Sequence, residues 1–160
     1  MASTAKTLTF VIPAYNMESY LDRCVNSLLS ASDISDLEVL IVDDGSKDGT
    51  LEYARKLERT NPGAVRAIHQ ENKGHGGAVN TGIAAATGMY VKVVDADDWV
   101  DPQAIDTVLD TLRAQHDTDE PIDMLVTNYV YDKVAKRHKT VVNFRRVMEA
   151  GRVLGWDDLG

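Results

Sequence analysis

Apolar segments and amphipathic stretches alternate along the chain. Mostly apolar runs occupy residues 8–12 and 37–42, and two further strand-like segments follow at 65–69 and 90–94. After each of them, apolar residues return every three or four positions, which is the spacing of one helix face. Continuous apolar strands separated by helices are typical of a parallel sheet covered on both faces. The pattern therefore predicts a mainly parallel, doubly wound α/β domain.

The same pattern gives the helices and their ends. The first helix is expected to carry an apolar stripe of Tyr20, Leu21, Cys24, Val25, Leu28 and Leu29. A second helix follows near Thr50, and a short third helix carries Val79 and Ile83 and is expected to stop at Gly88. Pro102 is placed at the start of the fourth helix, because proline is favoured in the first helical turn.

The last part of the chain has a different pattern. Residues 124–131 and 140–144 are β-rich and are joined by the basic segment 133–139. We expect a hairpin or two edge strands there, with the basic segment forming a solvent-exposed turn. No internal repeat is visible, and one domain is expected to cover residues 1–160.

Composition and charge narrow the function classes. With 160 residues, of which 44% are hydrophobic, the chain can bury a substantial core. Its net charge of −8 argues against a nucleic-acid partner, because binding a phosphate backbone needs a basic face. Cys24 is the single cysteine and is expected to be a packing residue. Neither a signal peptide nor a membrane-spanning run is apparent, so we expect a cytoplasmic protein, in which any association with a membrane would come from regions outside these residues.

Acidic residues follow two of the predicted strands. Asp43 and Asp44 come after the second strand, and Asp95, Asp97 and Asp98 come after the fourth. In an open α/β sheet, ligands bind beyond the carboxyl ends of the strands, so both clusters and residues 13–16 should face one crevice. Asp43, Asp44 and Ser46 alternatively form only a turn and a helix cap. That explanation is weaker for residues 95–98, because three neighbouring carboxylates repel one another.

These residue types suit a nucleotide and a metal. Alternate carboxylates can supply oxygen ligands to Mg²⁺ or Mn²⁺, which commonly combine one or two carboxylates with substrate phosphates. A carboxylate after the second strand can accept an N–H from a base edge, which uracil, thymine and guanine offer. Tyr15 is placed to pack against such a base, although a tyrosine in such a loop is often only a packing residue.

Four ordered motifs resemble a known family. They are Val11-Ile-Pro-Ala-Tyr-Asn16, Val42-Asp-Asp-Gly-Ser-Lys-Asp-Gly-Thr50, Asn72-Lys-Gly-His-Gly-Gly-Ala-Val-Asn-Thr-Gly-Ile83 and Asp95-Ala-Asp-Asp98. Together they resemble the signature of family 2 glycosyltransferases with the GT-A fold, over roughly residues 8–115. The resemblance implies a Rossmann-like sheet and transfer of a sugar from a nucleotide-diphosphate donor, with inversion at the anomeric carbon. It also implies that residues 120–160 begin the acceptor-side region.

The resemblance also assigns site residues. The nucleoside pocket would be lined by Pro13, Ala14, Tyr15 and Asp44, with Asp43 supporting it. Asp95 and Asp97, on either side of Ala96, match the Asp-x-Asp motif that holds ribose, diphosphate and metal, with Asp98 beside them. Glu18 is interpreted as a helix-start charge. The implied partners are a UDP, GDP or dTDP sugar and a glycan or lipid-linked acceptor.

Two departures from the family pattern change the expectations. Many members carry an arginine in the segment matching residues 78–80, and this chain has none there. Lys73, Gly74 and His75 are therefore candidates for meeting the diphosphate, although His75 is otherwise an ordinary loop histidine. The second departure is the general base that inverting transfer requires. In the family it lies in a later acceptor segment, so we expect these residues to be the donor-binding half of a longer enzyme, and Asp157 and Asp158 are not assigned as the base.

Two other classes share part of this pattern. A non-catalytic sugar-nucleotide-binding module would need the same donor residues without the base. A phosphorelay receiver also pairs adjacent acids after one strand with an aspartate after another. Receivers, however, place the acid pair after the first strand, whereas here a complete strand and residues 13–16 come first.

Overall fold

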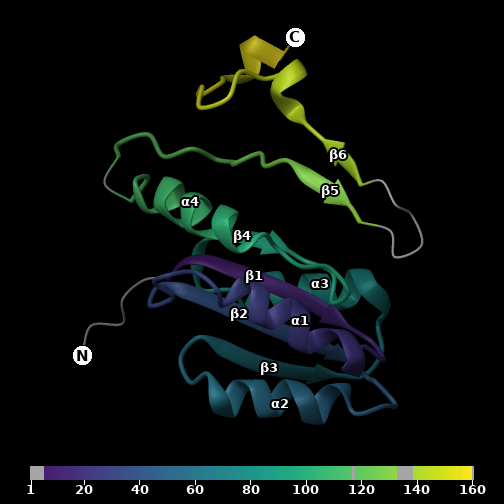
Figure 1. Cartoon of the computed structure of the whole chain (residues 1–160). Coiled ribbons are helices and arrows are strands. Elements are labelled where there is room, and N and C mark those ends of the chain that lie inside the picture. Colours follow the sequence, from purple (N-terminus) through teal and green to yellow (C-terminus); the bar gives the residue numbers. More distant parts are fainter. Residues whose placement is uncertain (1–5, 117, 133–138, 160) are drawn as a thin grey trace. The chain divides into compact units, whose positions relative to one another are not determined.

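The computed structural model describes residues 6–116, 118–132 and 139–159, which divide into two compact units, Met1–Asp117 and Thr118–Gly160. The first unit alternates strands and helices (Figure 1). Its elements are β1 (Lys6–Ala14), α1 (Glu18–Leu28), β2 (Leu37–Asp44), α2 (Thr50–Thr60), β3 (Val65–Gln70), α3 (Gly74–Ala85), β4 (Gly88–Val93) and α4 (Pro102–Arg113). The prediction of one domain over residues 1–160 stays a prediction.

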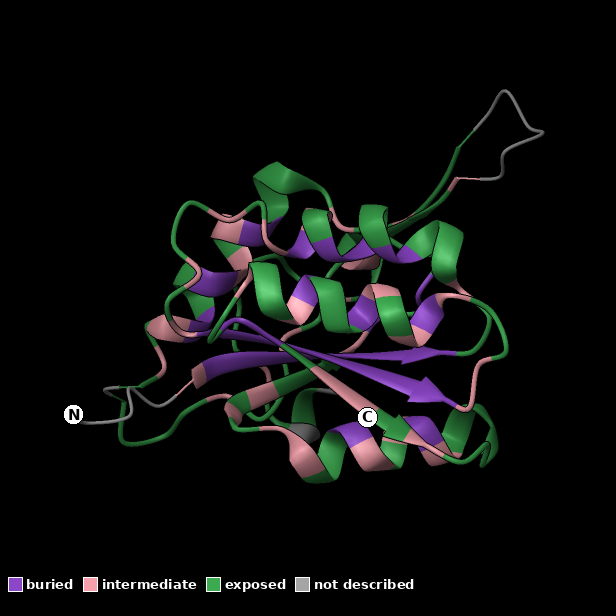
Figure 2. Cartoon of the chain, turned by 90° about the horizontal axis from the view of Figure 1, so that it is seen from below, coloured by how far each residue is buried: buried purple, intermediate pink, exposed green. Residues whose placement is uncertain are grey.

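The sheet of the first unit is parallel, with strand order β3-β2-β1-β4. Strands β1 and β2 lie in the centre, and every residue of β2 is buried (Figure 2). Helix α3 packs against β1 and β2, whereas α1 contacts α2 and α4. The chain reverses direction across the sheet after β3, because β4 pairs with the free side of β1. The predicted parallel α/β fold with helices on both faces is confirmed.

Burial is less complete than the sequence pattern predicts. The edge strand β4 exposes Met89 and Val91. Two residues assigned to apolar helix stripes are also exposed, Tyr20 at 53% and Ile83 at 49% of their surface. Cys24 is fully buried, as expected for a packing residue.

The end of α3 and the start of β4 correct one prediction. Gly88 does not stop the third helix, which ends at Ala85. Gly88 instead begins β4, where a Cβ atom would lie 2.6 Å from the backbone nitrogen of Thr9. The strand approaches β1 so closely at this point that only glycine fits without displacement.

Glu38 forms a buried polar network near the amino end of the inner strand β2. Its Oε2 accepts hydrogen bonds from Thr9 Oγ1 at 2.8 Å and from Thr87 N at 2.9 Å, and its Oε1 accepts from Arg66 Nη1 at 2.7 Å. Thr9 Oγ1 in turn accepts from Gly88 N at 2.9 Å. The network fixes the register of β4 against β1, and β4 leads directly into the second acidic cluster.

An ion pair and several hydrogen bonds hold the amino-terminal edge of the sheet together. Arg113 at the end of α4 donates to both carboxylate oxygens of Asp36, at 2.6 and 3.0 Å. The side-chain hydrogen bond from Arg113 is the main cause that lowers the pKa of Asp36 to about 2. Lys6 Nζ donates to three backbone carbonyls, those of Ser35, Leu37 and Gly63. These contacts lie at the amino ends of the strands, away from both acidic clusters.

The second unit contains the predicted hairpin. Strands β5 (Tyr129–Tyr131) and β6 (Thr140–Val142) pair antiparallel, and the 3₁₀ helices η1 (Phe144–Arg146) and η2 (Trp156–Leu159) follow. The ring of Tyr129 lies edge-on to that of Tyr131, with centroids 5.3 Å apart. Most of the basic segment 133–139 lies outside the described residues. Among the helices that the structure describes, none combines the length and apolarity required to cross a bilayer.

Candidate functional site

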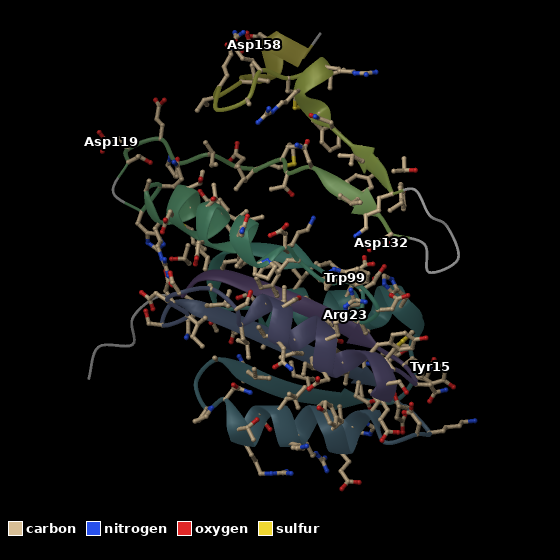
Figure 3. The ribbon with its side chains drawn as sticks, viewed as in Figure 1. Tyr15, Arg23, Trp99, Asp119, Asp132 and Asp158 are labelled. Carbon is tan, nitrogen blue, oxygen red and sulfur yellow. The ribbon has the colours of Figure 1, made fainter. Side chains whose placement is uncertain are left out.

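The loop after β1 is joined to the loop after β2. Asn16 has a positive φ of 55°, and its side chain accepts a hydrogen bond from Lys47 N at 2.8 Å. Its own backbone N–H donates to Ser46 Oγ at 3.0 Å. These reciprocal contacts hold the two loops together. Tyr15, which precedes Asn16, is 41% exposed beside them (Figure 3).

The start of α1 adds two more links between these loops. Met17 N donates to Thr50 Oγ1 at 2.7 Å, and Gly49 N donates to Glu18 Oε2 at 3.0 Å. A Cβ atom at position 49 would lie 2.5 Å from the Glu18 carboxylate, so a larger residue would require this exposed side chain to move away. Glu18 is thus in the first turn of α1, as predicted, and it also fastens the loop after β2. Ser46 does not cap α2, since its hydroxyl is used by Asn16 and the N-cap residue is Gly49.

Asp43, the last but one residue of β2, is a fully buried carboxylate. It pairs in register with Ala14 of β1 and with His69 of β3. His69 Nδ1 lies 2.7 Å from Asp43 Oδ2, whereas Oδ1 has no hydrogen-bond partner among the described residues. Burying an unpartnered carboxylate oxygen is costly, which marks Asp43 as a residue with a demand beyond folding. Pro13 and Ala14 beside it are buried as well.

Asp44 connects β2 to the glycine-rich turn that precedes α3. Its Oδ1 accepts from Gln70 Nε2 at 2.6 Å and from Lys73 N at 2.8 Å. Burial raises the pKa of Asp44, but the hydrogen bonds from Gln70, Lys73 N and Gly74 N outweigh it and hold the pKa below its ordinary value. Asp44 is therefore a carboxylate at neutral pH. The side chains of Asp43 and Asp44 leave opposite faces of the sheet, as alternation along a strand requires.

The glycine-rich turn reaches the second acidic cluster as well. His75 Nε2 lies 3.0 Å from Asp95 Oδ1, and both side chains are more than half exposed. Gly74 starts α3 with a φ of +75°, a conformation that favours glycine. The turn from Lys73 to His75 therefore contacts Asp44 on one side and Asp95 on the other. Helix α3 begins at this turn, and the first backbone N–H groups of a helix have no partner within the helix itself.

The acid loop, residues 95–100, presents its carboxylates to solvent. Ala96 is buried, whereas Asp95, Asp97 and Asp98 are exposed. Asp98 N donates to Asp95 O at 2.9 Å, which closes a tight turn. Burial, followed by the negative charges of Asp97 and Asp95, raises the pKa of Asp98. The acids thus repel one another in the absence of a cation.

Asp95 and Asp97 have the chemistry that a hard divalent cation requires. Both are exposed oxygen donors on one short loop, and Mg²⁺ and Mn²⁺ favour one or two carboxylates together with phosphate oxygens and water. Within the part of the chain that the structure describes, no group of three or more His, Cys, Asp or Glu side chains is arranged to hold a metal ion. Asp95 and Asp97 are thus two oxygen ligands of the kind that such a cation takes.

The sequence patterns did not identify several residues that contact the side chains of the candidate site. His69 and Gln70 bind the two aspartates of β2 because β3 places them directly opposite in the parallel register. The alternation of the two segments could have indicated this pairing once their register was known. Asn16 and Glu18 were found as motif or helix-start residues, but their partners at Lys47 and Gly49 depend on loop conformation.

Two acidic clusters meet a glycine-rich turn at the carboxyl edge of this parallel sheet. This arrangement is that of the GT-A class of glycosyltransferase domain, and solved structures of this class superpose on the chain. The family described as Glycosyl transferase family 2 matches residues 9–146. The chain therefore belongs to family 2 of the glycosyltransferases, as the motifs predicted, and the receiver interpretation is set aside.

Curated relatives and solved structures agree with this assignment. Over 106 residues the chain is 43% identical to the chondroitin synthase of Escherichia coli, which corresponds to 66% of this chain and 15% of that protein. It is 41% identical over 102 residues to the hyaluronan synthase of Pasteurella multocida, covering 64% of this chain and 10% of the relative. The chain thus spans only a small part of these relatives.

Two solved structures carry donor sugars. TarS 1-349 of S. aureus in complex with UDP-GlcNAc superposes with a TM-score of 0.61 at 27% identity, covering 69% of this chain and 32% of that one. The mannosyltransferase PcManGT of Pyrobaculum calidifontis in complex with GDP-Man and Mn²⁺ superposes with a TM-score of 0.60 at 28% identity, covering 72% and 34%.

Proposed function

We propose that the protein transfers a sugar from a nucleotide-diphosphate donor to an acceptor hydroxyl with inversion, and that this chain carries the donor and metal half of the reaction. One observation carries the proposal. The turn at the start of α3 contacts Asp44 through Lys73 N and Asp95 through His75. A single ligand with a base at one end and phosphates at the other can therefore span both acidic clusters.

The nucleoside end of the donor is assigned to the ends of β1 and β2. Asp44, held as a carboxylate, accepts the N–H of a uracil, thymine or guanine edge, and Asp43 supports it from the neighbouring position. Pro13, Ala14 and the exposed ring of Tyr15 line the same end. The donors bound to the two structural neighbours, UDP-GlcNAc and GDP-Man, belong to this set of bases.

The diphosphate end is assigned to the acid loop and the glycine-rich turn. Asp95 and Asp97 hold Mg²⁺ or Mn²⁺ together with the phosphates, with Ala96 as the buried link between them. The metal, when bound, stabilises the negative charge of the departing diphosphate. Lys73, His75 and the first N–H groups of α3, starting at Gly74, offer positive charge and donors in place of the missing arginine.

The acceptor is proposed to be a hydroxyl of a glycan or of a lipid-linked sugar. The chondroitin and hyaluronan synthases among the relatives favour polysaccharide or glycoconjugate synthesis. Attack by this hydroxyl requires a general base within hydrogen-bond reach. None of the residues described above is assigned that role.

Calorimetry tests the donor half. UDP and GDP are titrated into the protein with and without Mn²⁺, and we expect one of them to bind more tightly when the metal is present. Asp97→Asn should abolish the gain from Mn²⁺ while the circular dichroism spectrum stays that of the parent. Asp110→Asn, on the exposed side of α4, removes the same charge and serves as the matched control. If the folded parent bound neither nucleotide, the assignment would be wrong.

A non-catalytic sugar-nucleotide-binding module would give the same calorimetric result. The two functions separate in a protein that also contains the acceptor-side region, when it is incubated with the donor sugar and an oligosaccharide acceptor. A transferase releases the nucleoside diphosphate in proportion to elongated product, whereas a binding module returns the intact donor.

A further inference from the structure

Helix α1 contacts the acid loop at three points. Ser27 Oγ accepts a hydrogen bond from Val100 N at 3.1 Å. Cys24 Sγ donates to the carbonyl oxygen of Asp95 at 3.7 Å. The Arg23 guanidinium lies over the ring of Trp99, 3.3 Å from its centroid, and Figure 3 shows the two side chains together. The helix therefore holds the loop at its first residue and at its last two.

The three contacting residues form one face of α1. Positions 23 and 27 are four residues apart and positions 24 and 27 three apart, so their side chains are neighbours on the helix. Ser27 Oγ also donates to Cys24 O at 2.7 Å. This second bond turns the hydroxyl so that a lone pair is available to Val100 N–H. The contact is thus oriented by the helix itself.

Cys24 acts here as a donor. Burial, followed by the charges of Asp98, Asp97 and Asp95, raises the pKa of the Cys24 thiol to about 12. The thiol therefore keeps its proton at neutral pH and can donate to the Asp95 carbonyl. A thiolate at this position would add a fourth negative charge beside the three carboxylates.

The acid loop needs support before a cation arrives. Asp95, Asp97 and Asp98 repel one another, which favours conformations that spread the carboxylates apart. The amino end of α1 is itself fastened to the loop after β2 through Met17 and Glu18. Helix α1 therefore connects the nucleoside end of the proposed site rigidly to its metal end.

We propose that Ser27 and Arg23 are positioning residues that hold the acid loop in its metal-binding conformation in the absence of metal. The proposal rests on the donor-binding function proposed above. Loss of one such hydrogen bond should raise the Mn²⁺ concentration required for nucleotide binding about fivefold. Binding of the free nucleoside, which lacks the diphosphate, should not change.

The test compares three variants of the 160-residue chain with the parent. Ser27→Ala removes the acceptor for Val100 N–H, and Ser27→Thr restores a hydroxyl at the same position. Asn26→Ala is the matched control, because Asn26 lies on the same helix and bonds only to Asp22 among the hydrogen bonds described here. Each variant is measured by hydrogen exchange of residues 95–101 without metal, and by Mn²⁺ titration in the presence of UDP or GDP.

We expect faster exchange at Val100 and the fivefold shift in Mn²⁺ dependence for Ser27→Ala only, with recovery in Ser27→Thr. Unchanged exchange in Ser27→Ala would overturn the proposal, whatever the nucleotide result. Faster exchange with an unshifted Mn²⁺ titration would overturn the role in metal binding. If the parent shows no Mn²⁺-dependent nucleotide binding, the proposed function itself is refuted. Hydrogen exchange is measured without metal or nucleotide, so it reports on the loop contacts separately. If Ser27→Ala does not fold, Arg23→Met is measured in the same way.

Discussion

Replacing Glu38 with glutamine tests how much its buried hydrogen-bond network stabilises the fold. The Glu38 side chain is only 5% exposed, and both of its oxygens accept hydrogen bonds. Glutamine keeps the shape but has one acceptor oxygen and one donor nitrogen. In either orientation, therefore, its amide N–H₂ faces a donor, which is Arg66 on one side and Thr87 N–H on the other.

The magnitude follows from these contacts. Losing a hydrogen bond to a charged group costs about 1.5–3 kcal/mol. Arg66 is 46% exposed and can turn toward water, so losing its hydrogen bond to Glu38 should cost an amount at the low end of this range. The bonds from Thr9 and Thr87 also weaken when the carboxylate becomes neutral. We expect Glu38→Gln to lower the free energy of unfolding by about 2–3 kcal/mol.

Urea unfolding followed by circular dichroism measures this loss. Glu58→Gln is the matched control, because Glu58 is an acceptor for Ala67 N near the surface and should change stability by about 0.5 kcal/mol or less. Burial raises the pKa of Glu38, but bonds from Thr87, Thr9 and Arg66 outweigh it and hold the pKa below 4.5. The carboxylate's contribution is therefore complete above pH 4.5 and declines as the pH falls, so the difference between parent and Glu38→Gln should shrink in acid. A loss equal to that of Glu58→Gln at pH 7 would refute the reasoning.

Two further changes probe the loop after β2 and the opposite edge of the sheet. Gly45→Ala should lower the free energy of unfolding by about 1–3 kcal/mol, because Gly45 has a φ of +72° and a Cβ atom would lie 2.9 Å from Asn72 N. Urea unfolding measures this loss. Gly63→Ala is the control for the backbone part of the loss, since Gly63 has a φ of +82° but no neighbour within 4 Å of a Cβ atom. Arg113, together with the Thr7 hydroxyl, lowers the pKa of Asp36 from 3.8 to about 2, so their joint contribution of about 2 kcal/mol is complete above pH 3.8 and is lost as the pH falls through 2. Arg113→Met should remove the larger part of this acid-dependent component from a series of urea titrations between pH 2 and 6, because Thr7 still bonds Asp36, and an unchanged pH profile would contradict it.

The central strands and three of the helices could be predicted because large apolar residues mark their buried faces. Val39 to Val42 form a continuous apolar run, which is typical of a strand covered on both faces, and β2 is buried throughout. Helix α4 has its proline at the start and Asp101 as N-cap, accepting from Gln103 N at 2.8 Å. These signals are local, so the sequence alone contains them.

Helix α3 is the element in which large apolar residues do not mark the buried face. Its larger apolar residues indicate a buried face that includes Ile83, yet Ile83 is exposed and the buried residues are Ala78 and Gly82. A Cβ atom at position 82 would lie 2.2 Å from Val11 Cγ1. Close packing against β1 therefore selects small residues for the contacting face, and a hydrophobicity pattern assigns the face incorrectly. The partners of Asp43 and Asp44 were missed for a related reason, because they depend on the register of β3.

The two acidic clusters differ in a way that determines how they can work together. Asp43 and Asp44 are buried, and each already accepts hydrogen bonds from β3 or the glycine-rich turn, so the cost of desolvating them was met when the chain folded. Asp95, Asp97 and Asp98 remain exposed, and their mutual repulsion is offset only when a cation is present. Under the proposed function, a ligand that reaches only the first cluster would gain nothing from a metal, whereas one that carries phosphates to the second would bring both ligands and charge for the cation. Metal dependence should therefore follow the diphosphate and not the base. The short turn from Lys73 to His75, which contacts both clusters, is the part of the structure that links the two.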